Sequence, residues 1–278
     1  MVKTTDLIIA GLPRSGSTMT CHLLNKVPNV VALHEPMNPF AISIQEPKDI
    51  VVEFKAFFEE QRKSILENGF AKCKTTDGVI PTNSMGEFDA KSGRRIKLLN
   101  SDELKVDKPL DNNFLLAIKD PNFCAANLPW LKDHFQCFAI VRNPLSVLLS
   151  WNSVDMPCSD GYAPAAELYD KKLANLLRGE PDKFSRQIGL LMWHFEKYIS
   201  HIDPQNIIQY ENVIASGGKA LRVVHPNAEI LNEPLHSKNN NHLYEAALKS
   251  MLADKLLAIS DAPFWRFYQP DQIVSILN

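Results

Sequence analysis

Five short apolar runs are spread along the chain, and each has the length of a buried strand. They cover residues 7–10, 30–33, 114–118, 138–141 and 207–210. Other segments repeat apolar residues at helical spacing, which predicts helices from Ser17 onward and over 47–68, 145–152, 165–178, 184–202 and 242–257. Residues 71–112 are polar and rich in turn formers, so we expect loops there, with room for one hairpin.

Strands that alternate with helices predict an α/β fold, with a mostly parallel sheet and helices on both faces. The sequence shows no internal repeat, low-complexity tract or clear linker. We therefore expect one domain over residues 1–278.

The composition is that of an ordinary globular protein, with 45% hydrophobic and 22% charged residues. Thirty basic and 32 acidic side chains give a formal net charge of −2. A general nucleic-acid binder usually carries a basic excess, so we expect no nucleic-acid partner. A local basic pocket for one phosphorylated ligand remains compatible with this balance.

The cysteines do not form a metal or redox motif, because their number is odd and no C-x-x-C pair occurs. The five are Cys21, Cys73, Cys124, Cys137 and Cys158. We interpret them as reduced, buried thiols of a cytoplasmic protein. The first apolar run is too short for a signal peptide or a membrane span, and no other segment reaches that length, so we expect no span.

A phosphate-binding loop is predicted where the first strand meets the first helix. Gly11 to Gly16 follow the pattern G-x-x-x-x-G, and glycines let backbone N–H groups at a helix start close around an anion. Ser17 and Thr18 add hydroxyl donors. The alternative is a plain strand-to-helix turn.

The same loop separates two enzyme classes. ATP-binding loops read G-x-x-x-x-G-K-[ST], and the lysine reaches the β- and γ-phosphates. Here Ser17 occupies the lysine position, and the cation, Arg14, lies inside the loop. This difference argues against a kinase.

A second anion site is predicted after the strand at 138–141. Arg142 lies at its carboxyl end, where ligands bind in open α/β sheets, and Pro144 suits a helix start. Ser150 faces the same space if that helix packs back toward the loop. An arginine and a hydroxyl suit a phosphate monoester. The alternative is an arginine paired with a carboxylate and a serine bonded within its own helix.

Together the two motifs resemble those of the PAPS-dependent sulfotransferases, where PAPS is 3′-phosphoadenosine 5′-phosphosulfate. The first looks like the family's 5′-phosphosulfate loop, and the second like its 3′-phosphate motif, R-[DN]-P-x-x-[AV]-x-x-S. The variant P-R-S-G at 13–16 is closest to the branch of carbohydrate 6-O-, tyrosylprotein and bacterial sulfotransferases. Shorter matches at 33–36, 118–121 and 208–214 extend the resemblance over residues 7–214.

The resemblance implies a three-layer, P-loop-type fold and transfer of a sulfuryl group from PAPS to an acceptor hydroxyl, with PAP as the product and no metal. It also implies the cofactor-binding residues, which are Arg14, Ser15, Gly16, Ser17, Thr18, Arg142, Ser150 and Tyr210. Arg14 is expected to stabilise the leaving phosphate as well. The polar loop at 237–241 lies about where the family folds a C-terminal loop over the nucleotide.

Glu35 aligns with the glutamate that serves as base in the tyrosylprotein enzymes, so we expect it to take the proton of the acceptor hydroxyl. His34 is the rival base, because an imidazole titrates near neutrality. A structural ion pair is the alternative for Glu35, and for Lys119 a contact with the sulfonate and a structural pair are equally open.

The expected acceptor is a carbohydrate or another small molecule, lipid or peptide with a hydroxyl group. Two other functions compete with this reading. One is a P-loop kinase of a small metabolite, favoured by the apolar run that ends at Asp120. The other is a non-catalytic nucleotide-binding module, which the joint presence of Arg14, Glu35, Arg142 and Ser150 disfavours.

Overall fold

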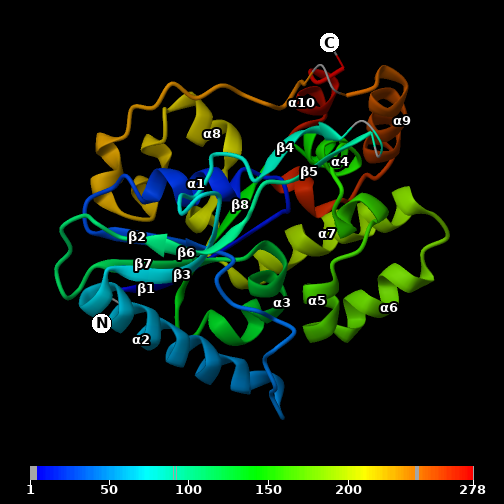
Figure 1. The fold of residues 1–278 in the computed structure, drawn as a ribbon. Coiled ribbons are helices and arrows are strands. Elements are labelled where there is room, and N and C mark those ends of the chain that lie inside the picture. Colours follow the sequence, from blue (N-terminus) through cyan, green and yellow to red (C-terminus); the bar gives the residue numbers. More distant parts are fainter. Residues whose placement is uncertain (1–4, 90, 92, 242–243, 278) are drawn as a thin grey trace.

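The five predicted apolar runs form one parallel sheet in the computed structural model, which describes residues 5–89, 91, 93–241 and 244–277 (Figure 1). The strands are β1 (Asp6–Gly11), β2 (Val30–His34), β7 (Leu115–Lys119), β8 (Gln136–Val141) and β9 (Ile207–Gln209). Their order is β2-β7-β1-β8-β9, and each neighbouring pair is parallel. Their inward and outward side chains are both buried, as expected for a sheet covered on both faces.

Helices form the two outer layers, which confirms the predicted three-layer α/β fold. On one face lie α1 (Ser17–Leu24) and α8 (Tyr210–Ala215), seen above the edge-on sheet in Figure 1. On the other lie α2 (Ile50–Asn68) and α3 (Pro121–Leu131), and α7 (Lys183–His201) packs against α3. Strands β1, β2, β7 and β8 end at the same edge of the sheet, and this edge holds the candidate site.

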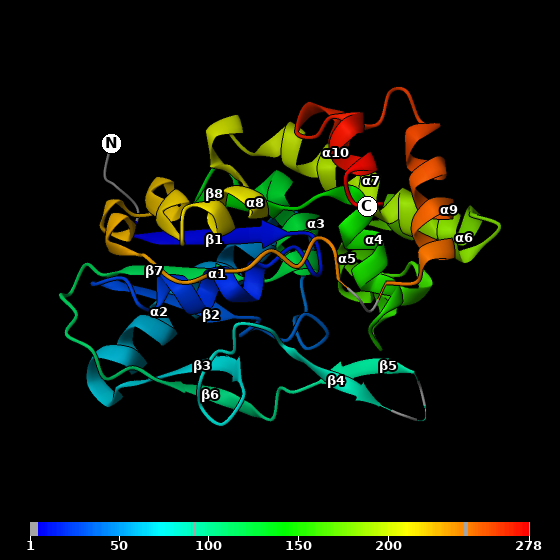
Figure 2. The same cartoon turned by 90° about the horizontal axis from the view of Figure 1, so that it is seen from above.

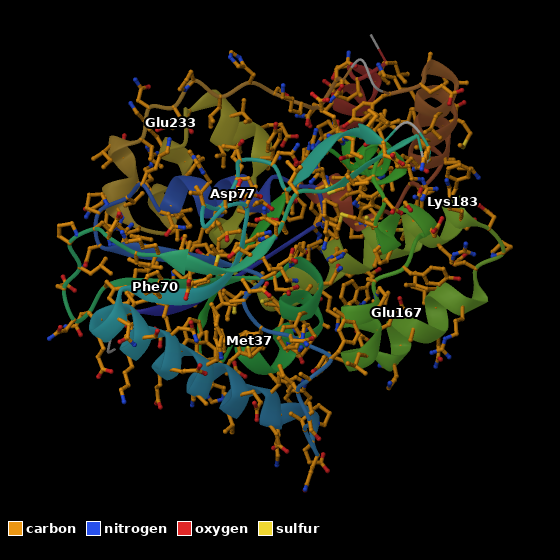
Figure 3. All side chains as sticks on the ribbon, viewed as in Figure 1. Met37, Phe70, Asp77, Glu167, Lys183 and Glu233 are labelled. Atoms are coloured by element: carbon orange, nitrogen blue, oxygen red, sulfur yellow. The ribbon has the colours of Figure 1, made fainter. Side chains whose placement is uncertain are left out.

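The one hairpin allowed for over 71–112 is present, but the prediction of loops for the rest was partly wrong, because a second antiparallel pair forms there. One joins β3 (Phe70–Thr75) to β6 (Ser101–Lys105), and the other is a hairpin of β4 (Met85–Asp89) and β5 (Arg94–Lys97). Figure 2 shows both pairs beyond the β2 edge of the sheet. Figure 3 labels Phe70, the first residue of β3, and Asp77, which follows that strand. These strands carry many charged residues, so their apolar pattern is weak.

The remaining helices lie mostly around the carboxyl edge of the sheet. They are α4 (Pro144–Asn152), α5 (Pro164–Tyr169), α6 (Lys171–Gly179), α9 (Ala246–Leu257) and α10 (Pro270–Val274). The single helix predicted over 165–178 is wrong, because Asp170 ends α5 and its carboxylate caps α6. Tyr210 begins α8 instead of ending β9, and α3 and α10 were not predicted.

Two further predictions concern the cysteines and the membrane. All five cysteines are buried and free, as expected. None of the helices in the described part of the chain is long and apolar enough to span a bilayer. The predicted late helix is α9, and the first two residues of its predicted range, 242–243, lie outside the described residues.

Candidate functional site

A cavity of about 880 Å³ opens where β1, β2, β7 and β8 end. Eight of the ten residues predicted for the site line it, and they are Arg14, Gly16, Ser17, Thr18, Glu35, Arg142, Ser150 and Tyr210. Ser15 and His34 are fully buried and lie outside its lining. The fold therefore brings together side chains that are almost 200 positions apart in the sequence.

The phosphate loop has the backbone geometry that an anion cradle requires. Arg14 and Gly16 have φ angles of 68° and 88°, and Ser15 N–H donates to the Leu12 carbonyl at 3.0 Å. No side chain caps the start of α1, so its first N–H groups remain available to an anion. Only glycine fits at position 16, because a Cβ there would lie 2.6 Å from the Tyr210 ring.

Arg14 reaches across the cavity to α4. Its Nε donates to Ser150 Oγ at 3.3 Å and its Nη2 to Asn83 Oδ1 at 2.9 Å. Burial, then the charges of Arg95 and Arg142, lower its pKa to about 10. Among the described residues no carboxylate forms an ion pair with Arg14, so its charge is uncompensated.

Arg142 ties the phosphate loop to the loop at 237–241. Its Nη1 donates to the Arg14 carbonyl at 2.9 Å, its Nε to Asn239 Oδ1 at 2.8 Å and its Nη2 to the Lys238 carbonyl. The guanidinium also lies over the Tyr210 ring, 4.7 Å from its centre. These acceptors are all neutral. The alternative of an arginine paired with a carboxylate therefore does not hold for the residues that the structure covers.

Glu211 is a positioning residue that the sequence analysis missed. Its Oε1 accepts hydrogen bonds from Asn143 N (3.0 Å) and Asn239 Nδ2 (2.8 Å), and its Oε2 accepts one from the Tyr268 hydroxyl (3.0 Å). It thereby fixes the 237–241 loop against the turn that carries Arg142. The sequence signals for this role were an acidic residue directly after the predicted strand at 207–210 and its place in the match at 208–214.

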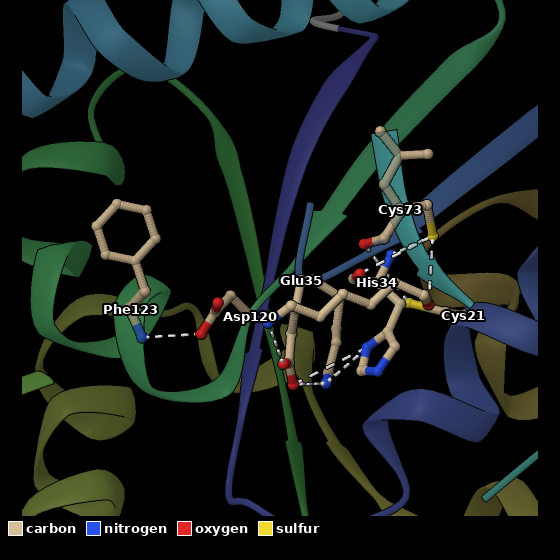
Figure 4. A network of polar contacts seen from close by, with 9 residues as sticks. Cys21, His34, Glu35, Cys73, Asp120 and Phe123 are labelled. Carbon is tan, nitrogen blue, oxygen red and sulfur yellow. Dashed lines mark hydrogen bonds and ion pairs between the residues drawn. The ribbon is translucent and has the colours of Figure 1, made fainter. Parts of the chain in front are cut away.

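Glu35 follows β2 directly and faces the cavity between two lysines. Its φ is 46°, and its two oxygens lie 3.2 Å from Lys119 Nζ and 3.2 Å from Lys74 Nζ (Figure 4). Burial opposes the charged form, but Lys119, then His34, Lys74 and Lys97, outweigh it and hold the pKa of Glu35 well below its usual range. Glu35 is therefore ionised at neutral pH. The ion pair considered as its alternative role is present, and it makes Glu35 a weaker base than an unpaired carboxylate.

His34 is buried behind the cavity wall and is not among the residues that line it. It is 1% exposed, and its Nδ1 lies 3.2 Å from Lys119 Nζ. Burial and the Lys119 charge lower its pKa to about 3, so the imidazole is neutral. Of the two candidate bases, only Glu35 is among the residues that line the cavity.

Asp120 is a second carboxylate in the lining, next to Lys119. Its Oδ1 accepts a hydrogen bond from Phe123 N at 3.0 Å and so caps α3 (Figure 4). Burial and the nearby Glu35 charge raise its pKa to about 6. The two carboxylates thus have pKa values displaced in opposite directions, an arrangement common where protons are transferred.

Positive charge dominates the cavity, although the whole chain has a net charge of −2. Seven cationic side chains line it, namely Arg14, Lys74, Arg95, Lys97, Lys119, Arg142 and Lys238. Three carboxylates accompany them, namely Glu35, Glu87 and Asp120. Such a surplus in a concave site attracts an anionic ligand. In the described residues, no group of three or more His, Cys, Asp or Glu side chains is placed to hold a metal ion.

Three of these cations were not predicted from the sequence, namely Lys74, Arg95 and Lys97. All three belong to strands of the 71–112 segment, for which loops were expected. Arg95 and Lys97 are two residues apart on β5, so they share one face of the strand. That spacing was the available signal, but it became meaningful only once the segment was known to be a strand.

No protein-family model matches the chain, and no curated protein matches it either. Among solved structures, a sulfotransferase from Alicyclobacillus acidocaldarius is 12% identical with a TM-score of 0.42, over 100% of this chain and 95% of that one. The sulfotransferase STF9 from Mycobacterium avium is 15% identical with a TM-score of 0.37, over 92% and 77%. The sulfotransferase domain of the Synechococcus PCC 7002 olefin synthase is 13% identical with a TM-score of 0.36, over 98% and 93%. Similarities this low do not assign an activity.

Proposed function

We propose that the protein is a PAPS-dependent sulfotransferase that transfers a sulfuryl group to an acceptor hydroxyl. The observation that carries the proposal is that one positively charged cavity is lined by a lysine-free phosphate loop, by Arg142 and Ser150, and by the ionised Glu35. The cavity volume and the uncompensated arginines suit a nucleotide with two separate anionic groups.

When bound, PAPS supplies an activated sulfuryl group. The phosphate loop and Arg14 would hold its 5′-phosphosulfate, and Arg142 with Ser150 would hold its 3′-phosphate. The acceptor oxygen bonds to sulfur as the bond from sulfur to the bridging phosphate oxygen breaks. Arg14 and the α1 N-terminus stabilise the charge that develops on the leaving phosphate. Glu35 receives the proton of the acceptor hydroxyl.

The acceptor is proposed to be a carbohydrate or another small molecule with a hydroxyl group. Its pocket would lie on the Glu35 side of the cavity, near Lys74 and Lys97, whose charges act on Glu35. A P-loop kinase is the second candidate, favoured by Asp120, which follows a strand adjacent to β1 and lines the same cavity.

Nucleotide-dependent stabilisation separates the two candidates. A ligand that binds the native state raises the melting temperature by mass action, and at 100 times its Kd it adds about 2.7 kcal/mol of stability. We expect PAP to raise the melting temperature more than ATP with magnesium does, because the loop lacks the lysine for the β- and γ-phosphates. The measurement is thermal unfolding at matched ligand concentrations. A larger shift with ATP and magnesium would favour the kinase.

The second measurement tests the role of Arg142. Arg142→Ala should weaken PAP binding by about 10–100-fold, since a hydrogen bond to a charged group contributes about 1.5–3 kcal/mol. Adenosine 5′-phosphosulfate lacks the 3′-phosphate and should lose much less affinity. Arg142→Lys keeps the charge and serves as the control for the contacts with the 237–241 loop. Equal losses for both ligands would show that Arg142 only holds the loops together.

A further inference from the structure

Arg95 lines the cavity, and its backbone is held by the residues that follow α4. Its backbone N–H donates to the Ser153 carbonyl at 3.0 Å, and its carbonyl accepts from Asp155 N at 3.0 Å. Strand β5 is thereby attached to the residues that follow α4. Arg95 is 8% exposed and belongs to the cavity lining, and its guanidinium is held by a hydrogen bond to Ser153.

The guanidinium of Arg95 is only partly satisfied. Its Nη2 donates to Ser153 Oγ at 2.7 Å, while its Nε is buried and has no partner in the described residues. No carboxylate of that part of the chain forms an ion pair with it. A buried cation without a counter-charge is costly, which indicates that an anion completes the site. Burial, together with the nearby Arg142 charge, also lowers the pKa of Arg95.

Arg95 belongs to the same corner of the cavity as the predicted 3′-phosphate ligands. Ser153 Oγ, which accepts from Arg95, donates to the Ser150 carbonyl at 2.9 Å. Arg14 donates to the Ser150 hydroxyl. The charges of Arg95 and Arg142 both act on Arg14, so the three guanidinium groups lie close enough to repel one another. A dianion among them would replace this repulsion with attraction.

We propose that Arg95 is a third arginine of the nucleotide site and that it binds the 3′-phosphate of PAPS from the side of the β4–β5 hairpin. The proposal rests on the proposed function. This gives the β4–β5 hairpin a role, because the hydrogen bonds between β5 and the residues after α4 bring Arg95 close to Ser150. A planar guanidinium with free donors suits a phosphate monoester better than a lysine would.

The test compares Arg95→Gln with the control Arg94→Gln. Arg94 is the preceding residue on β5, lies outside the cavity lining and bonds to Ser159 Oγ at 3.0 Å. Titration calorimetry with PAP, AMP and inorganic phosphate measures affinity, and thermal unfolding without ligand measures stability. We expect Arg95→Gln to weaken PAP binding by about 10–100-fold and AMP binding by less than about threefold. The control Arg94→Gln should change neither the PAP affinity nor the AMP affinity. The ligand-free stability of Arg95→Gln should not fall, since a repelling charge is removed.

The outcomes separate this proposal from the function on which it rests. Unchanged PAP affinity in Arg95→Gln, or an equal loss for PAP and AMP, overturns the role of Arg95 while leaving the sulfotransferase proposal intact. If the wild-type protein fails to bind PAP but binds phosphate through Arg95, the anion site stands and the proposed function falls. If the wild-type protein binds neither ligand, both fall.

Discussion

Replacing Glu35 with glutamine is expected to lower turnover by about 10²–10⁴-fold, the usual contribution of a general base. Glutamine has the same shape but cannot accept the proton of the acceptor hydroxyl. Glu35 is ionised and lines the cavity. PAP affinity should remain at its wild-type value, because the predicted phosphate ligands are other residues. The measurement is the single-turnover rate with any working acceptor, alongside PAP titration.

Two further variants make this result interpretable. Glu87→Gln removes another carboxylate from the cavity lining and should leave the rate within about twofold of wild type, because nothing assigns it a proton-transfer role. His34→Ala should lower the rate less than Glu35→Gln does, since the imidazole is buried and does not line the cavity. Near-normal turnover in Glu35→Gln combined with inactivity in His34→Ala would identify His34 as the base. If neither change matters, the acceptor ionises unaided.

Replacing Lys119 with methionine is expected to destabilise the protein by up to about 3 kcal/mol, the lower end of the usual cost of removing one partner of a buried ion pair, because Lys74 still pairs with Glu35. The Lys119 side chain is 2% exposed and lies 3.2 Å from Glu35 Oε1. Lys74→Met is the matched control. Lys74 lies at the same distance from Oε2 but is 37% exposed, so its loss should cost less than about 1 kcal/mol. Urea unfolding at pH 8 measures both.

The double variant and the pH dependence identify the cause of that loss. Glu35→Gln combined with Lys119→Met should be more stable than Lys119→Met alone, because the carboxylate that has lost its buried partner is removed as well. The pKa of Glu35 is lowered in the folded protein, so its contribution is present above about pH 4.5 and is lost as the pH falls below that value. In Lys119→Met, Glu35 takes up a proton more readily. The gap to wild type should therefore narrow in acid, and a gap independent of pH would point to lost packing instead.

The central sheet was predictable because its signals are local. Each strand is a continuous apolar run, since both faces are covered, and Gly16 marks the turn into α1. The β3–β6 and β4–β5 pairs have no such pattern, because they lie beyond the edge of the sheet and carry exposed, charged residues. Their pairing joins residues up to 35 positions apart, as Phe70 and Lys105 are, and propensity alone does not specify such contacts.

The candidate site, too, was predictable from the sequence only in part. The sequence alone determined which residues follow the strand ends, and in a parallel sheet these residues must meet at one edge, so Arg14, Glu35 and Arg142 line one cavity. Only the tertiary structure showed that Glu35 lines the cavity and that His34 does not. Both side chains contact Lys119 Nζ, and the backbone turn at Glu35, whose φ is 46°, leaves only the carboxylate in the cavity lining. Tertiary structure likewise brought Arg95 to the cavity, because its position depends on the hydrogen bonds between β5 and the residues after α4.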